Sequence, residues 1–283
     1  MSMLITSNHS RDIVGLKYVY PVLSRRASGL SIGINFNTNN ACNWRCIYCQ
    51  VPDLTVGAAP EIDFQVLEDE LRFFLDTVLY GDFYQRFQVP EHQQVIKDIA
   101  ISGNGEPTSV KAFAEAVALI GRIATEFGVL PNSNYVLITN GSLVHQPKVQ
   151  AGLKVLNDYG GEVWFKFDSA TNEGLALMNN TRQSFQTHTQ NLLLASQCCS
   201  TKLQTCLVDY DGKGLSEQEK LAFLQLLTTL KASDANVQQV MLYTIARPSL
   251  QPEASRLAPL PVEILNQFAD DIRCAGFTVS VSV

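Results

Sequence analysis

Short apolar runs alternate with amphipathic segments of helical period along most of the chain. Six runs rich in β-branched and other apolar residues predict strands. They lie at residues 30–36, 96–102, 135–139, 162–168, 202–208 and 237–245. Each run is followed by a segment whose apolar positions repeat every three or four residues, which predicts a helix. These helices are expected at residues 62–79, 110–127, 147–159, 184–196, 216–230 and 262–274.

Two of the helical segments carry more specific signals. The first has five apolar residues at helical spacing, which we expect to be buried: Leu67, Leu71, Phe74, Leu75 and Val78. In the fifth, Ser216 and Glu219 have the spacing of a capping box, so we expect the helix to begin there.

The order of these elements predicts the fold class. A strand followed by a helix, six times over, is typical of a parallel sheet covered by helices. A closed barrel of this kind needs eight such units, so six indicate an α/β fold with a partial (β/α)6 barrel, formed by residues 1–283 as one domain. We expect residues 1–29 to pack on it as an N-terminal extension and the alternating residues 277–283 to add an edge strand. The chemistry should lie at the carboxyl ends of the strands.

Composition and charge narrow the class of protein. The 283 residues are 46% hydrophobic and 17% charged, which is enough for a large core. The 21 basic and 27 acidic residues give a net charge of −6, which disfavours a nonspecific binder of nucleic acid or of an anionic membrane. No apolar run of membrane-spanning length and no secretory signal pattern is evident, so we expect a cytoplasmic protein.

Three of the seven cysteines share the loop after the first predicted strand. Cys42, Cys46 and Cys49 are separated by three and then two residues. Clustered cysteines in an intracellular chain more often bind metal or take part in chemistry than form disulfides. Three thiolates on one loop suit a [4Fe–4S] cluster, and because full ligation takes four cysteines, one iron is left open. A zinc site completed by a fourth ligand and a chance group of buried thiols are the alternatives.

The other four cysteines have no ligand spacing that we can assign. We expect all of them to have packing roles: Cys198, Cys199, Cys206 and Cys274.

The pattern Cys42-x3-Cys46-x2-Cys49 after a first strand resembles the signature of the radical S-adenosylmethionine (SAM) superfamily. The resemblance implies that the open iron binds the amino and carboxylate groups of SAM, and that the reduced cluster cleaves the carbon–sulfur bond. The 5′-deoxyadenosyl radical then takes a hydrogen atom from a substrate. The resemblance also implies an external one-electron donor of the flavodoxin or ferredoxin type. The superfamily usually has an aromatic residue before the last cysteine, here Tyr48, whose backbone would face the adenine.

The loop after the second strand resembles the glycine-rich segment that binds the methionyl amino group in that superfamily. It reads Gly103, Asn104, Gly105 and Glu106. Glycine permits a close approach of the backbone, and we expect Glu106 to orient the loop. An ordinary turn is the structural alternative.

Further polar residues stand at the ends of the third and fourth strands. Lys166 and Asp168 share one face of their strand. The resemblance implies that they and Asn140 contact the methionine carboxylate or the ribose of SAM. A surface ion pair and an Asn-Gly turn are the alternatives. Arg25, Arg26 and Arg247 could bind a carboxylate or phosphate of the substrate, or stay solvated.

Several segments together resemble the wyosine-synthase-related branch of iron–sulfur oxidoreductases. They are residues 24–35, 41–50, 102–108, 138–142 and 247–248. Members of that branch act on a guanosine of transfer RNA or are uncharacterised relatives. This chain lacks cysteines before Cys42 for the second cluster of the wyosine-base enzymes. We therefore predict hydrogen abstraction from an unidentified small molecule, peptide or RNA, with no catalytic residue assigned. Modification of a transfer RNA guanosine, a non-enzymatic iron–sulfur electron carrier or sensor, and a zinc-stabilised binding module are the alternatives.

Overall fold

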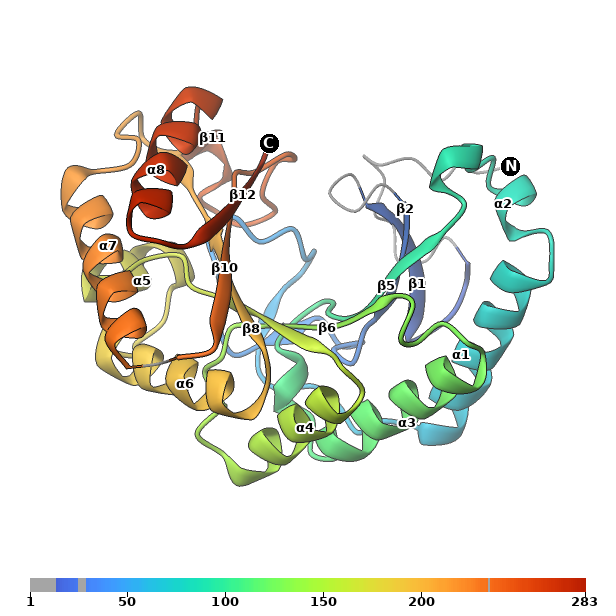
Figure 1. Cartoon of the computed structure of the whole chain (residues 1–283). Helices are drawn as coiled ribbons and strands as arrows, with labels where there is room; N and C mark the ends of the chain where they lie inside the picture. The colour runs from blue at the N-terminus through green and yellow to red at the C-terminus, as the bar shows by residue number, and fades with distance from the viewer. Residues whose placement is uncertain (1–13, 25–28, 234) are drawn as a thin grey trace.

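The computed structural model describes residues 14–24, 29–233 and 235–283. Within these residues an eight-stranded sheet has the order β1-β2-β5-β6-β7-β8-β10-β12. Its strands are β1 (Val19–Ser24), β2 (Gly29–Ile34), β5 (Ile96–Ile101), β6 (Asn134–Thr139), β7 (Glu162–Lys166), β8 (Thr201–Cys206), β10 (Val237–Tyr243) and β12 (Thr278–Ser282). β1 is antiparallel to β2, and the other neighbours are parallel. The edge strands β1 and β12 do not meet, so the barrel stays open (Figure 1).

Helices cover the outer face of the curved sheet (Figure 1). They are α1 (Phe64–Leu79), α3 (Phe113–Glu126), α4 (Pro147–Asp158), α6 (Phe185–Cys198), α7 (Glu217–Ala232) and α8 (Val262–Cys274). The six predicted strands and six predicted helices are therefore all present, and the partial barrel is confirmed. The tail forms β12 parallel to β10, which confirms the expected edge strand.

The structure also contains elements that the apolar pattern did not predict. They are β1, the helices α2 (Phe83–Arg86) and α5 (Asn172–Asn179), the strand pair β3 (Ala41–Cys42) and β4 (Thr55–Val56), the strand pair β9 (Val208–Tyr210) and β11 (Leu257–Pro259), and the 3-10 turns η1 (Glu91–Gln93), η2 (Pro107–Ser109) and η3 (Ala254–Arg256). β1 lies within the stretch predicted as an N-terminal extension. The single-domain organisation stays a prediction.

The main apolar core lies between the outer face of the sheet and the helices. The five α1 residues predicted to be buried are all within it. Alternation along the strands sends one set of side chains, such as Ile32, Ile99 and Leu137, outward into this core. Burial of this apolar surface is the main favourable contribution to folding.

The predicted cap of α7 is confirmed, because the Ser216 side chain accepts a hydrogen bond from the Glu219 backbone N–H. The Glu219 carboxylate does not complete the capping box. It accepts hydrogen bonds instead from Ser169, at 2.8 Å, and from Thr171 at the start of α5. The beginning of α7 is thereby connected to the segment that follows β7.

The inner face of the sheet carries ionisable groups among apolar ones. By the same alternation, Asp98, Glu162 and Lys202 point to the side opposite the core. Lys202 pairs with Glu162 at 2.7 Å, and the indole N–H of Trp164 donates to the same carboxylate, also at 2.7 Å. Asp98 is only 5% exposed and accepts a hydrogen bond from Ser31. The fold thus keeps ionisable groups inside the barrel, on the face that a ligand would contact.

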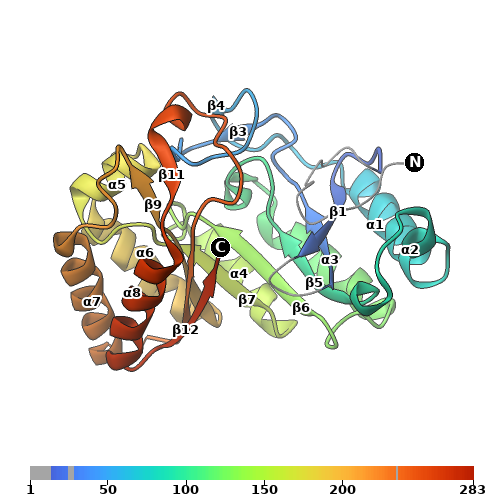
Figure 2. The ribbon, with the colours of Figure 1, turned by 90° about the horizontal axis from the view of Figure 1, so that it is seen from above.

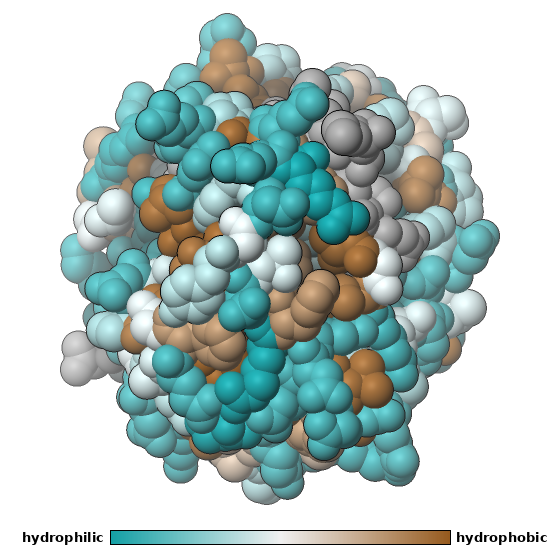
Figure 3. Space-filling model, turned by 90° about the vertical axis from the view of Figure 1, so that its right-hand side faces the viewer, coloured by the Kyte–Doolittle hydropathy of each residue, from teal (hydrophilic) through white to brown (hydrophobic). Residues whose placement is uncertain are grey.

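The outer surface is mostly hydrophilic on the side of α1 and α2, with small, separate apolar areas (Figure 3). Scattered apolar side chains such as Phe73 on α1 are normal for a protein surface. Within the described residues, no helix has the length and apolarity needed to cross a bilayer.

The buried carboxyl of Asp98 makes stability depend on pH. Burial raises its pKa from 3.8 to about 6, so above pH 4 the unfolded chain loses this proton before the native state does. The free energy of unfolding therefore falls as the pH rises from about 4 to about 6. The Asp98→Asn variant has no such charge to bury. We therefore expect its free energy of unfolding to rise relative to that of the wild type by up to about 3 kcal/mol between pH 4 and pH 6. Urea unfolding of both proteins at several pH values measures the difference, and a constant difference would contradict it.

Candidate functional site

The cysteine loop, residues 35–63, connects β2 to α1 and crosses the carboxyl ends of the strands (Figure 2). Cys42 lies in β3, and Cys46 and Cys49 follow in irregular backbone. Ile47 and Tyr48 point into a small second apolar cluster with Cys206, Val208 and Ile245. That cluster fixes the middle of the loop onto the ends of β8 and β10.

The end of α5 holds the loop from one side. The backbone N–H of Ile47 donates to the Met178 carbonyl at 2.9 Å, and that of Arg45 donates to the Asn179 carbonyl at 3.3 Å. These carbonyls belong to the last turn of a helix, where carbonyls have no partner within the helix. The loop thus supplies N–H donors to the free carbonyls of the helix, and the helix supplies acceptors to the loop.

Residues 247–253 hold the loop from a second side. The Ser249 hydroxyl donates to the Ile47 carbonyl at 2.6 Å, and the Leu250 N–H donates to the Cys49 carbonyl at 2.9 Å. Two parallel hydrogen bonds of 2.7 and 2.8 Å join the Arg45 guanidinium to the Glu253 carboxylate. Such bidentate pairing fixes orientation as well as distance.

Two thiols of the loop, those of Cys42 and Cys46, have raised pKa values. Burial raises the pKa of Cys42 to about 12 and that of Cys46 to about 11. Nearby acidic groups, Glu106 for Cys42 and Asp168 for Cys46, act in the same direction. Since a metal takes the thiolate, loading this site must release protons.

Three cysteine thiols on one loop are donors of the kind that hold an iron–sulfur cluster. In the described part of the chain, no three His, Cys, Asp or Glu side chains are grouped closely enough to hold one ion. The thiols of a [4Fe–4S] cluster bind different irons, so they need not converge on one point. N–H donors also point at the sulfurs, from Trp44 to Cys42 and from Val51 to Cys49 at 3.5 Å, and such donors adjust cluster potentials.

The glycine loop packs directly on the cysteine loop. A side chain at Gly105 would place its Cβ 2.0 Å from the Ala41 carbonyl oxygen, and one at Gly103 would meet Asn35 at 2.2 Å. Gly103 also has a φ of 153°. Asn104 bonds Asn35 through its backbone N–H at 3.0 Å. Here the glycines are needed for the contact between the two loops.

Glu106 is buried and fully used in hydrogen bonds. It accepts from the Thr108 N–H and hydroxyl at 3.1 and 2.6 Å, from the Thr139 hydroxyl at 2.6 Å and from the Asn140 N–H at 2.7 Å. Burial raises its pKa, and these bonds oppose the rise. The arrangement matches the orienting role expected for Glu106, because it joins the loops that follow β5 and β6.

Asn140 connects the loop after β6 to the cysteine loop. Its amide donates to Asn43 at 2.9 Å, and Asn43 in turn donates to the Ser142 hydroxyl at 2.7 Å. Asn43 directly follows Cys42. The backbone beside the first thiol is thus held by side chains of a distant loop, since Asn43 and Ser142 are 99 positions apart in the sequence.

Tyr48, Asp168 and Lys166 meet at the end of β7. The Tyr48 hydroxyl donates to Asp168, and the Lys166 ammonium lies 3.4 Å from the Tyr48 hydroxyl and 3.2 Å from that of Tyr243. Burial alone would lower the pKa of Lys166, but Tyr243 and Asp168 outweigh it and raise the pKa. Lys166 is therefore an ammonium surrounded mainly by phenol groups rather than one member of a surface ion pair.

Of the three arginines expected to contact the substrate, only Arg247 lies within the described residues. Arg25 and Arg26 lie outside the described residues. The Arg247 carbonyl accepts a hydrogen bond from Gln50 of the cysteine loop at 3.1 Å, and a substrate role for its side chain stays a prediction.

The four cysteines outside the loop differ in exposure. Cys199 and Cys206 are buried and Cys198 is half-buried, in keeping with packing. The prediction for Cys274 was wrong, since it is exposed near the end of α8, where that helix turns a polar face to solvent.

Sequence reasoning missed the asparagines that hold the site together, Asn35, Asn40, Asn43 and Asn179. A signal existed for three of them, because residues 35–43 contain a run rich in asparagine. Asparagine side chains both donate and accept, so they can satisfy irregular backbone. Asn179 lies on α5, which was not predicted.

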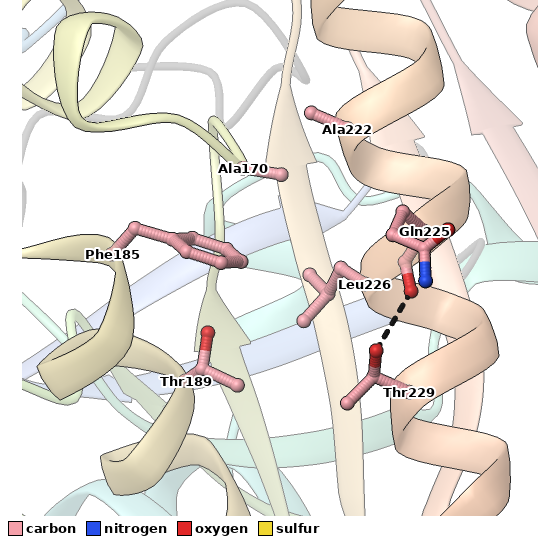
Figure 4. A pocket seen from close by; sticks show the side chains of 7 residues that line it. All are labelled: Ala170, Phe185, Thr189, Ala222, Gln225, Leu226 and Thr229. Atoms are coloured by element: carbon pink, nitrogen blue, oxygen red, sulfur yellow. Dashed lines mark hydrogen bonds between the residues drawn. The ribbon is translucent and has the colours of Figure 1, made fainter.

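A separate pocket of about 210 Å³ lies outside the sheet, between α6 and α7 (Figure 4). None of its seven lining residues is ionisable: Ala170, Phe185, Thr189, Ala222, Gln225, Leu226 and Thr229. It offers no group for acid–base or metal chemistry. The cysteine loop is therefore the better candidate for the functional site.

Solved structures with a similar fold include a radical SAM methyltransferase and TYW1. A radical SAM methyltransferase from Sphaerobacter thermophilus matches with a TM-score of 0.59 and 14% identity, over 93% of this chain and 68% of that one. The structure of TYW1 with a lysine-pyruvate adduct bound matches with a TM-score of 0.54 and 15% identity, over 87% of this chain and 73% of that one. The resemblance inferred from the cysteine loop is thereby confirmed at the level of the fold.

The sequence relatives match a smaller part of the chain than the solved structures do. The chain is 30% identical over 135 residues to a UPF0026 protein of Helicobacter pylori strain J99. That match covers 47% of this chain and 38% of the relative, so the chain spans well under half of the relative's length. No protein-family model matches the chain.

The contact between the two loops can be tested with Gly105→Ala. The new Cβ would collide with the Ala41 carbonyl, a backbone atom that cannot turn aside, so we expect a loss of about 1–3 kcal/mol in the free energy of unfolding. Gly57→Ala is the matched control, because its Cβ would stand at an ordinary 3.4 Å from the Ala41 Cβ. We expect that control to stay within about 0.5 kcal/mol of the wild type. Equal stabilities of the two variants in urea unfolding would refute the contact.

Proposed function

We propose that Cys42, Cys46 and Cys49 hold a [4Fe–4S] cluster and that the protein is a radical SAM enzyme. The observation that carries this proposal is the three-cysteine loop itself, placed at the carboxyl ends of the strands of a radical SAM fold. Its packing on the glycine loop adds support, because the two segments expected to bind the cluster and SAM are in direct contact.

The residues around the loop provide the groups that SAM requires. The half-buried glycine loop would offer backbone carbonyls to the methionyl amino group, and the Lys166 ammonium suits the carboxylate. Asn104 would offer its amide to the ribose, and Asn140 and Asp168, which are held by neighbouring residues, would line this part of the site. Tyr48 closes one side through its bond to Asp168. When bound, the cluster and SAM would supply a 5′-deoxyadenosyl radical that takes a hydrogen atom from the substrate.

The protein's own side chains would position these groups and keep water out. Glu106 holds two loops in fixed relation without offering a free carboxylate oxygen. Trp44 is 4% exposed and packs against His188 at a ring distance of 5.3 Å, which closes the loop on the side of α6. An electron carrier or sensor would need neither the glycine loop nor a buried ammonium beside the thiols, so we favour an enzyme.

The substrate is proposed only as a class. The fold neighbours include a methyltransferase and TYW1, so a shared fold does not define the molecule acted on. Polar groups at the carboxyl ends of the strands, such as the Lys166 ammonium and the Tyr243 hydroxyl, suit a polar small molecule or peptide. Modification of a transfer RNA guanosine of the wyosine type is less favoured, because the net charge is −6. An external one-electron donor of the flavodoxin or ferredoxin type would reduce the cluster.

Iron analysis tests the ligands. Anaerobically reconstituted wild type should hold about four irons per chain, and replacing Cys42, Cys46 and Cys49 by alanine should abolish this. Cys274→Ala, which changes an exposed cysteine on α8, is the control and should keep the full iron content. Four irons in the triple variant would show that other residues bind the cluster, and zinc without iron or sulfide in the wild type would favour a zinc-stabilised module.

Cleavage of SAM tests the reaction. The reconstituted protein given dithionite and SAM should slowly form 5′-deoxyadenosine, which chromatography with mass detection measures. Lys166→Met removes the charge that would bind the carboxylate while keeping a chain of similar length, so we expect weaker SAM binding and at least about a tenfold lower rate at limiting SAM. An intact cluster that yields no 5′-deoxyadenosine above background would point instead to an electron carrier.

A further inference from the structure

Asn179, the last residue of α5, makes a side-chain contact with one of the candidate cluster ligands. Its amide nitrogen lies 3.3 Å from the Cys46 sulfur and 2.6 Å from an Asp168 carboxylate oxygen. The side chain is fully buried, with 0% exposure. Because an amide NH₂ group has two hydrogens, one can go to the carboxylate and the other to the sulfur.

Cys46 differs in this respect from the other two cysteines of the loop. Cys42 and Cys49 accept from backbone N–H groups two residues further along the loop, those of Trp44 and Val51. Cys46 accepts from a side chain 133 residues away in the sequence. The donor to Cys46 can therefore be removed by replacing a side chain, whereas the donors to Cys42 and Cys49 belong to the backbone.

The orientation of the Asn179 amide is fixed by its surroundings. Its partner Asp168 is held by the Tyr48 hydroxyl and by the Cys206 backbone N–H at 2.9 Å. The backbone carbonyl of Asn179 accepts a hydrogen bond from the Arg45 backbone N–H at 3.3 Å. Turning the amide over would set its oxygen against a carboxylate and a sulfur, which both repel it.

The side-chain oxygen of Asn179 is buried and has no hydrogen-bond partner among the described residues. A buried carbonyl without a partner is destabilising. The amide therefore costs one unpaired oxygen and provides two N–H donors. One is directed at the Asp168 carboxylate and the other at the Cys46 sulfur.

We propose that Asn179 is a positioning residue that raises the reduction potential of the cluster through its N–H bond to Cys46, an inference that rests on the proposed function. Reduction adds one electron, taken from the external donor, and no bond forms or breaks. The added negative charge spreads onto the cysteine sulfurs, so a hydrogen-bond donor stabilises the reduced state more than the oxidised state. Asn179 thereby makes the cluster easier to reduce.

The variant Asn179→Leu keeps the size of the side chain and removes the N–H. We expect it to hold four irons and to have a cluster that is about tenfold harder to reduce, a fall of about 59 mV for a one-electron couple. Asn191→Leu is the matched control, because Asn191 is also buried and donates two side-chain bonds, but to the carbonyls of Gly141 and Ser142. Its potential should equal that of the wild type. The readout is a redox titration followed by electron paramagnetic resonance, without SAM.

A second measurement needs no variant. In wild type labelled with ¹⁵N-asparagine, pulsed electron paramagnetic resonance of the reduced cluster should detect a coupled asparagine nitrogen, and its absence overturns the proposal. An unchanged potential in Asn179→Leu with an intact cluster also overturns it, while the proposed function stands. A wild type that cannot bind a [4Fe–4S] cluster overturns the proposed function itself, which keeps the two failures distinct.

Discussion

The candidate site depends on hydrogen bonds that irregular backbone cannot make by itself. The cysteine loop runs through residues 35–63 with only the two-residue strands β3 and β4 as regular structure. Buried backbone groups need partners, and here these come from other elements: the end of α5, residues 247–253 and the asparagine side chains of the strand-end loops. The placement of the three thiols is therefore a property of the whole strand-end surface, not of the loop sequence alone.

The two faces of the sheet have different roles, one in stability and one in forming the site. The outer face, with Ile32, Ile99 and Leu137, is buried against helices and provides stability. The inner face accepts ionisable groups such as Glu162 and Lys202, which pair with each other. Because successive side chains point to opposite sides, one strand can serve both purposes: in β7, Phe165 belongs to the core while Lys166 faces the site.

The regular elements were predictable because their signals are local. The apolar spacing of α1 and the cap at Ser216 depend only on nearby residues, and both are found. The short helix α5 escaped prediction because its eight residues bury only Leu175 and Asn179, which leaves little periodicity to detect. Trp164 lies in an apolar run, yet it is half-buried on the inner face and donates a hydrogen bond to Glu162. Which face of a strand meets the core is decided by the closure of the sheet, which no single run encodes.

The same distinction applies to the site. The cysteine spacing and the glycine loop were visible in the sequence, since each is contiguous. The bonds that join them, such as Asn43 to Ser142 and Asn179 to Cys46, link residues 99 and 133 positions apart. The contacts of Arg45 with Glu253 reach across 208 positions. During synthesis, then, the three thiols of the cysteine loop emerge early, but the partner of Arg45 emerges only with residue 253, so the loop can complete these contacts only when most of the chain has been made.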